Sequence, residues 1–120
     1  MDFNDPSFRE LLDALHDGVY ITDADGITLK VNGAYERLTG LRSEDVVGQH
    51  MQALVEQGVI SQSVSLRVLK EGRALSLMQS VSQGKRLLVS GTPILDATGQ
   101  VRYVVSTVRN SSVMSVSYTH

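Results

Sequence analysis

The sequence predicts a single α+β domain in which a strand pair is followed by a group of helices and then by further antiparallel strands. Two turns of the same kind, Asp-Ala-Asp-Gly at residues 23–26 and Asp-Ala-Thr-Gly at residues 96–99, each lie between short runs of strand-forming residues. Acidic residues and Gly supply the tight or left-handed backbone of a hairpin, so each segment is predicted to be one. Between the two hairpins the apolar spacing becomes helical.

Length, composition and charge fit one domain and argue against several kinds of partner. The chain has 120 residues, a hydrophobic content of 42% and a formal net charge of −2, which suits a single core. Its eleven basic residues are scattered, so nothing in the charge indicates direct binding to nucleic acid or to an anionic membrane. No apolar run approaches the roughly 20 residues of a membrane span, and the acidic N-terminus does not resemble a signal peptide. We expect a cytoplasmic location, which the absence of Cys also fits.

The first predicted helix covers residues 7–16, with Ser7 as a possible N-cap and Asp17-Gly18 as its end. It places four large apolar residues on one stripe at the spacing i, i+3, i+4, i+7. These residues are Phe8, Leu11, Leu12 and Leu15.

Four further helical segments are predicted between the hairpins. Asn32 is a good N-cap for residues 33–39, which Gly40 closes. Ser43 is expected to cap a short helix that ends before Gly48, and residues 51–57 form another turn or two. The longest candidate covers residues 60–71 and ends at Gly72.

Extended structure is predicted from Ala74 onward. Over residues 75–82 an alternation typical of a strand places Leu75, Leu77, Gln79 and Val81 on one face and Ser76, Met78, Ser80 and Ser82 on the other. A long strand follows the turn at Gln83-Gly84, and Gly91 and Pro93 within it suggest a bulge or a sheet edge. The Ser-rich residues 111–120 have no convincing period and are expected to be a flexible tail or linker stub.

An ordered set of short motifs accompanies this succession of elements. They are Asp17-Gly18, Asp23-x-x-Gly26, Asn32, Leu38-Thr39-Gly40, Gly48, the segment from Lys85 to Pro93, Asp96-x-x-Gly99 and Val108-Arg109-Asn110. Together they closely resemble a PAS domain over residues 9–110, with residues 1–8 as a leader. The strand with Gln79 and the segment after it look most like PAS domains that precede the ATPase module of bacterial sigma-54-dependent activators, and sensor histidine kinases are the close alternative. Asn110-Ser111-Ser112 departs from the Asp-Ile-Thr that often ends such domains, so the effector domain is expected to lie outside this chain.

The resemblance implies a five-stranded antiparallel sheet flanked by short helices, with a pocket between sheet and helices and an N-terminal helix on the outer sheet face. By resemblance Tyr20 and Thr22 face the pocket, and alternation then turns Val19 and Ile21 outward. The first helix, folded back or donated by a partner, is the obvious cover for these two residues. A homodimer interface is therefore predicted from Phe8, Leu11, Leu12, Leu15, Val19 and Ile21.

Non-covalent binding of a small molecule in the inner pocket is the functional hypothesis, and a core filled by its own side chains is the alternative. The polar candidates are Tyr20, Thr22, Tyr35, Gln79, Ser90 and Thr92. Several buried hydroxyls in one cavity would indicate a polar ligand, water or mutual hydrogen bonds, because an unpaired buried hydroxyl costs stability. The apolar wall is predicted from Leu38, Met51, Leu54, Ile60, Val64, Val68 and Leu77, among which Met51, Val64 and Val68 are the chosen contacts.

Cofactor and catalytic chemistry find little support in the residues. Without Cys there is no covalent photochemical flavin, thioester-linked chromophore or thiolate metal site. His50 is the one candidate for a haem ligand in the helical group, but a surface or capping role is expected for it. No two His residues are close in sequence, and no G-x-S-x-G or Gly-rich phosphate motif occurs. We expect no cofactor, no metal and no enzyme activity.

The sequence therefore predicts a dimeric, signal-sensing PAS domain that serves as the input of a bacterial transcriptional regulator, with non-covalent binding of a small molecule as the functional hypothesis. The alternative is a ligand-free structural PAS module that mediates dimerisation in a sensor histidine kinase.

Overall fold

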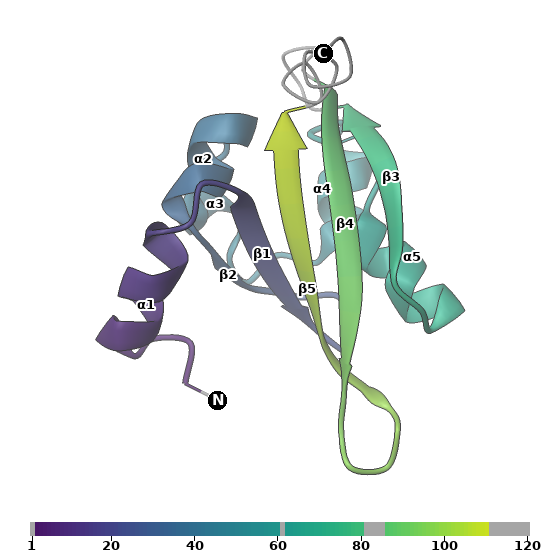
Figure 1. The fold of residues 1–120 in the computed structure, drawn as a ribbon. Coiled ribbons are helices and arrows are strands. Elements are labelled where there is room, and N and C mark those ends of the chain that lie inside the picture. Colours follow the sequence, from purple (N-terminus) through teal and green to yellow (C-terminus); the bar gives the residue numbers. More distant parts are fainter. Residues whose placement is uncertain (1, 61, 81–85, 111–120) are drawn as a thin grey trace, which may run out of the picture.

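Five antiparallel strands form one sheet in the order β2-β1-β5-β4-β3, and the helices lie on both of its faces (Figure 1). The computed structural model describes residues 2–60, 62–80 and 86–110. In chain order the elements are α1 (Pro6–Asp13), β1 (Gly18–Asp23), β2 (Thr28–Val31), α2 (Gly33–Thr39), α3 (Ser43–Val46), α4 (Met51–Glu56), α5 (Val64–Glu71), β3 (Leu75–Ser80), β4 (Arg86–Leu95) and β5 (Val101–Asn110). The α+β fold class and the five-stranded antiparallel sheet are confirmed. The predicted tail, residues 111–120, lies outside the described residues.

The two Asp-containing turns are confirmed as hairpin connections, and they are built alike. In the first, the Asp23 carboxylate accepts hydrogen bonds from the backbone N–H groups of Asp25 and Ile27. In the second, Asp96 accepts from the N–H groups of Thr98 and Gln100. The glycines that close the turns, Gly26 and Gly99, have φ values of +86° and +87°, which an L side chain rarely adopts. The first turn joins β1 to β2 and the second joins β4 to β5.

Helix ends follow the sequence signals in part. Asn32 caps α2 by accepting a hydrogen bond from the N–H of Tyr35, and Gly40 ends that helix with a φ of +75°. The predicted caps Ser7 and Ser43 are wrong, because Asp5 caps α1 with Pro6 as its first residue, and Ser43 is itself the first residue of α3. α1 also ends at Asp13, before the predicted end.

α5 begins later than predicted because Ser63 caps it. The Ser63 hydroxyl accepts a hydrogen bond from the N–H of Leu66, so the helix covers residues 64–71 instead of 60–71. Its predicted end is confirmed, since Gly72 stands at the C-cap with a φ of +71°. This start places Val64, Ser65 and Val68 against the sheet, where all three are buried.

β4 runs without a break through Gly91 and Pro93, where a bulge or sheet edge was expected. The shift in its register with β5 lies after Pro93, between Ile94 and Leu95. β3 pairs with β4 only as far as Gly91, so Pro93 stands beyond the end of β3. A Pro is tolerated there because that side of the strand has no ladder partner to which an N–H would donate.

Each face of the sheet carries its own apolar cluster. On the inner face, covered by α2, α4 and α5, residues such as Tyr20, Leu87, Val89, Val104 and Val108 are almost fully buried. On the outer face, Leu12 of α1 packs with Val19 and Ile21 of β1. α1 thus folds back over β1 of its own chain and provides the cover that the sequence required.

Asn32 ties this outer helix to the sheet. Its side-chain carbonyl accepts hydrogen bonds from the N–H groups of Val19 and Tyr35, at 2.8 and 2.9 Å. Its amide group donates to the backbone carbonyls of Leu12 and Asp17, at 2.8 and 3.1 Å. One buried side chain therefore connects α1, β1 and α2.

Candidate functional site

The inner face of the sheet is shaped by a close approach of α5 at Gly91. A Cβ atom on Gly91 would lie 2.9 Å from Val68 Cγ2, which is closer than real Cβ atoms approach, and 3.3 Å from Val64 Cγ1, which is a tight contact. The helix therefore rests directly on the β4 backbone. This contact brings Ser65 of α5 within 3.4 Å of Ser106 of β5, measured between the two hydroxyl oxygens.

Two polar side chains of β1 reach this inner face without a partner. Tyr20 is 1% exposed and Thr22 is 0% exposed, and neither the Tyr20 hydroxyl nor Thr22 Oγ1 has a hydrogen-bond partner among the described residues. Buried polar groups in folded proteins are nearly always paired, with protein, water or ligand. Their inward orientation is confirmed by the register, which places Tyr20 opposite Ser106 and Thr22 opposite Val104.

Hydroxyl groups surround the Tyr20 phenol. Burial raises its pKa, and the hydroxyls of Ser65, Ser106 and Ser63 lie near enough to oppose that rise in part. None of the three meets the distance and angle of a hydrogen bond with the phenol oxygen. We name Tyr20, Ser65 and Ser106, together with Thr22 two residues further along the same face of β1, the hydroxyl cluster. Its members come from β1, β5 and α5, and they leave hydrogen-bonding capacity unused in a buried place.

Tyr35 of α2 stands beside this cluster. Its ring centroid is 5.4 Å from that of Tyr20, with the two rings tilted by 56°. Burial raises the pKa of Tyr35, and repulsion from a charged Tyr20 adds to the rise. Both phenols are therefore held in the neutral form that donates a hydrogen bond.

The residues of the predicted apolar wall lie in the inner core, and their contact with a ligand stays a prediction. Met51, Val64 and Val68 are each at most 1% exposed and belong to the same cluster as Tyr20 and Tyr35. Met51 also accepts a weak hydrogen bond from the hydroxyl of Thr28, at 3.2 Å.

Gln79 is buried on the inner face, as predicted, but it lies apart from the hydroxyl cluster. The row of paired residues that contains Tyr20 continues through Ser106 and Gly91 to Leu75. Gln79 is four residues further along β3 than Leu75, and β3 is three strands away from β1. Its carbonyl oxygen is buried with no partner among the described residues. The two places are separate, so one small ligand does not span them.

Ser90 and Thr92 were predicted to face the pocket, and this orientation is wrong. Val89 and Gly91 point inward, so alternation along β4 turns Ser90 and Thr92 to the outer face. There Ser90 exchanges a 2.7 Å hydrogen bond with Ser76 of β3, and Thr92 is exposed. The error arises because Gly91 contributes no side chain, and a strand with an inward Gly shows no apolar alternation at that point.

The predicted dimer residues divide into a covered and an exposed set. Leu12, Val19 and Ile21 are buried within the chain at 7%, 4% and 4% exposure. Leu11 and Leu15 remain 63% and 44% exposed. Phe8 lies between these extremes, and Leu15 follows the end of α1. A contact with a second copy through this helix would therefore use Leu11 and Leu15.

Sequence reasoning missed Ser65 and Ser106. Ser65 is one of several Ser residues in a segment of poor helix formers, and its inward direction depends on where α5 begins. Ser106 shows a usable signal, since it stands between Val104 and Val108 in the row of β5 residues that faces inward.

His50 caps α4 in the structure. Its Nδ1 atom accepts a hydrogen bond of 3.0 Å from the N–H of Gln52. Among the described residues, no group of three or more His, Cys, Asp or Glu side chains is placed to hold a metal ion. Within the same residues, no helix is long and apolar enough to span a membrane.

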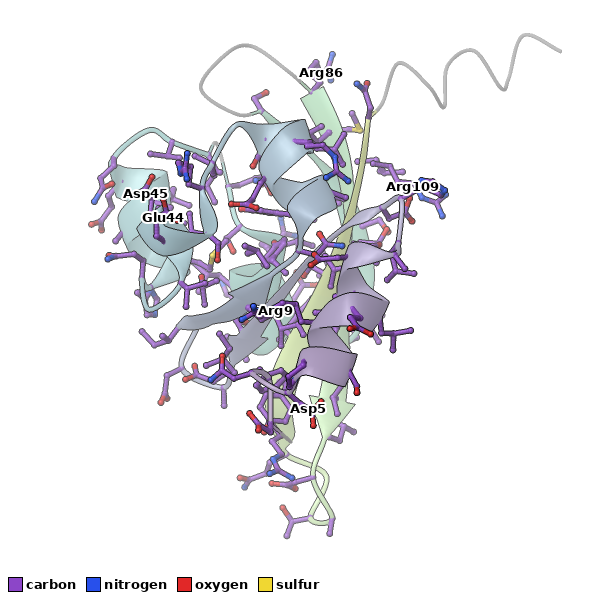
Figure 2. The ribbon with its side chains drawn as sticks, turned by 90° about the vertical axis from the view of Figure 1, so that its left-hand side faces the viewer. Asp5, Arg9, Glu44, Asp45, Arg86 and Arg109 are labelled. Carbon is purple, nitrogen blue, oxygen red and sulfur yellow. The ribbon has the colours of Figure 1, made fainter. Side chains whose placement is uncertain are left out.

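Charged side chains are spread over several elements. Figure 2 shows Asp5 and Arg9 at α1, Glu44 and Asp45 on α3, and Arg86 and Arg109 on β4 and β5. Arg109 forms an exposed ion pair of 3.0 Å with Asp17, which precedes β1.

The chain belongs to the PAS fold family, whose model matches residues 7–110. Its structure is similar to the PAS domain of nitrogen regulation protein NR(II) from Vibrio parahaemolyticus, with a TM-score of 0.62, 18% identity and coverage of 85% of this chain and 95% of that one. It is also similar to the PAS domain of histidine kinase ThkA, with a TM-score of 0.63, 21% identity and coverage of 80% and 100%.

A third similar structure is described as VqmA bound to DPO, with a TM-score of 0.61 and 19% identity. There the match covers 84% of this chain and 54% of that one. No curated protein sequence matched the chain. At these identities the structural likeness shows the fold, and the family membership makes the chain a signal-sensing PAS domain.

Proposed function

We propose that this PAS domain is the input module of a bacterial transcriptional regulator and that it binds a small polar molecule, without a covalent bond, at the hydroxyl cluster. The observation that carries the proposal is the pair of unpartnered, buried oxygen atoms on Tyr20 and Thr22. Leaving such atoms unpaired costs on the order of 1–3 kcal/mol each. A ligand or an ordered water that pairs with them recovers this energy.

The cluster favours a ligand with both donor and acceptor groups. Hydroxyls of Tyr, Thr and Ser each donate one hydrogen bond and accept others. No charged group among the described residues acts on the pKa of the buried Tyr20 phenol, so an uncharged polar group suits it better than an ion. VqmA, of which the matched fold covers 54%, is described as bound to DPO, which is in keeping with a small-molecule ligand here.

The position of the cluster gives a ligand a way to act on the fold. Tyr20 belongs to β1, Ser106 to β5 and Ser65 to α5, so a molecule that bonds to all three links the sheet to the helix. A ligand shifts a conformational equilibrium only by its difference in affinity for two arrangements. A change in the spacing of α5 and β5 provides such a difference, and β5 would pass it to an effector domain.

Dimerisation through the exposed Leu11 and Leu15 and a cytoplasmic location complete the proposal. We expect no cofactor, because covalent flavin and thioester chemistry need a Cys that the sequence lacks. Neither catalysis nor direct binding to nucleic acid is part of the proposed role, in keeping with the scattered charges.

The second candidate is a ligand-free structural PAS module that mediates dimerisation in a sensor histidine kinase. The tight packing of α5 on Gly91 favours it, because Val64 and Val68 already fill the space above that part of the sheet. In this case the hydroxyl cluster is a part of the packed core in which the oxygen atoms of Tyr20 and Thr22 stay unpaired.

Tyr20→Phe reports whether the buried hydroxyl is paired, and native mass spectrometry reports whether its partner is a ligand. If the hydroxyl is paired with a ligand or water, the substitution lowers the free energy of unfolding by about 1 kcal/mol, whereas in a dry core it is neutral or stabilising. Urea unfolding measures this difference, and native mass spectrometry of the wild type detects a bound molecule as an added mass that denaturation removes. Thr107→Val, on the outer face of β5, is the matched control for loss of a hydroxyl. A stabilised Tyr20→Phe variant together with no added mass in the wild type would exclude the ligand.

A further inference from the structure

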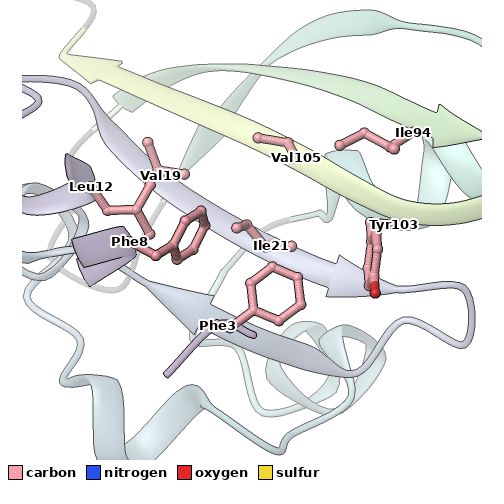
Figure 3. A pocket seen from close by; sticks show the side chains of 8 residues that line it. All are labelled: Phe3, Phe8, Leu12, Val19, Ile21, Ile94, Tyr103 and Val105. Carbon is pink, nitrogen blue, oxygen red and sulfur yellow. The ribbon is translucent and has the colours of Figure 1, made fainter. Parts of the chain in front are cut away.

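A second cavity lies on the opposite face of the sheet, between α1 and the strands. Its volume is about 220 Å³. Figure 3 shows the side chains around it, which come from the N-terminal segment, α1, β1, β4 and β5. They are Phe3, Phe8, Leu12, Val19, Ile21, Ile94, Tyr103 and Val105.

The lining of this cavity is apolar throughout. No polar atom contributes to its surface, so neither water nor a charged group finds a hydrogen bond there. Even an enclosed apolar cavity of roughly 150 Å³ admits a benzene-sized molecule. A cavity of about 220 Å³ is large enough for a somewhat bigger apolar molecule and far too small for a helix or a strand.

Three aromatic rings define one wall. Phe3 lies edge-on to Phe8 and to Tyr103, with ring centroids 5.6 and 5.3 Å apart. Such edge-to-face contacts are favourable for aromatic pairs, and an inserted planar ring would extend them. Ile94 is 38% exposed at the rim, so the cavity is open to solvent at this point.

We propose that this outer cavity is a binding site for a small, uncharged aromatic molecule of one or two fused rings. The ligand lies between α1 and the outer face of β1 and β5, on the far side of the sheet from the hydroxyl cluster. Its affinity depends on the docking of α1, because Phe8 and Leu12 form part of the site. Binding therefore stabilises the folded-back position of the N-terminal helix.

The experiment uses the whole chain and 1-methylindole as the probe. The sequence contains no Trp, so fluorescence excited beyond Tyr absorption belongs to the probe. We expect saturable binding with a dissociation constant on the order of 1 mM or below and a blue shift of the probe emission. Intermolecular nuclear Overhauser effects are expected from the probe to the methyl groups of Ile21 and Val105. Indole-3-carboxylate, which carries a charge, should bind at least about tenfold more weakly.

Val105→Phe fills the cavity and should weaken binding at least about tenfold. Leu88→Phe adds a similar ring on the outer face of β4, away from the cavity, and should leave the affinity unchanged. If circular dichroism shows that Val105→Phe does not fold, Ile94→Phe takes its place, because the partly exposed Ile94 has room for a larger side chain. Tyr20→Phe should leave probe binding unchanged, so the test is independent of the inner site.

The proposal is overturned if the probe does not saturate or if its Overhauser effects reach Val64 and Val68 of the inner core. It is also overturned if the folded filling variants bind as well as the wild type. A loss of probe binding that follows the concentration of dimer would show that a side chain of a second copy occupies the cavity, which contradicts a small-molecule site.

Discussion

Asn32 is a single residue whose side chain holds several elements of the fold together. The sequence predicts its role as the N-cap of α2, since Asn before a helical segment is a standard signal. The bonds to Val19 and to the carbonyl groups of Leu12 and Asp17 involve residues 13 to 20 positions away. A cap signal is local, so the long-range part of the role becomes visible only when α1 is seen to fold back.

The buried tyrosines predict a pH dependence at the alkaline end. The pKa of Tyr35 is raised in the folded state by burial and by repulsion from a charged Tyr20, while in the unfolded chain it stays near 10. The free energy of unfolding therefore keeps the full contribution of the neutral phenol below pH 10. Above pH 10 it falls by about 1.4 kcal/mol per pH unit for each such group. Tyr35→Phe should make the free energy of unfolding fall less steeply above pH 10, as measured by urea unfolding at several pH values. Equal slopes for variant and wild type would contradict this.

Among the elements, the type of each segment, helix or strand, could be predicted better than where it begins and ends and which of its side chains point to the core. The hairpins, the Asn32 and Gly40 boundaries and the inward direction of Tyr20, Thr22 and Gln79 agree with the sequence-based expectation. Ser90 and Thr92 do not, because the face of β4 is set by its register with β5 and not by a pattern of its own. The start of α5 differs because the i, i+4, i+8 spacing of Ile60, Val64 and Val68 extends the helical pattern back to Ile60, whereas the Ser63 cap starts the helix at Val64.

The contact of α5 with β4 makes Gly91 the critical position of that pair. In Gly91→Ala the new methyl group would stand 2.9 Å from Val68 Cγ2, so α5 must move outward. Overpacking of this kind costs about 1–3 kcal/mol, and the displacement should also change the environment of Ser65 and Ser106. Thermal or urea unfolding measures the loss, with the exposed Thr92→Ala on the same strand as control. A variant as stable as the wild type would show that the helix adjusts without cost.

For the whole molecule, substitution of the exposed leucines of the N-terminal region tests whether the proposed dimer forms through them. Leu11 and Leu15 contribute little to the core of the single chain, as their 63% and 44% exposure shows. The double variant Leu11→Asp/Leu15→Asp should therefore fold and yet be monomeric in light scattering, because two charges enter an apolar contact. Val47→Asp, a substitution of another exposed apolar residue, should keep the wild-type association. An unchanged dimer in the double variant would exclude this surface.

The strand order has a kinetic consequence. β1 pairs with β5, so residues near position 20 find their partners near position 106. Contacts between such distant positions carry a high cost of loop closure, and folds that depend on them form slowly. During synthesis β1 leaves the ribosome long before β5, and until then only β2 is at hand to pair with it. β1 therefore cannot pair with β5 until almost the whole domain has been made.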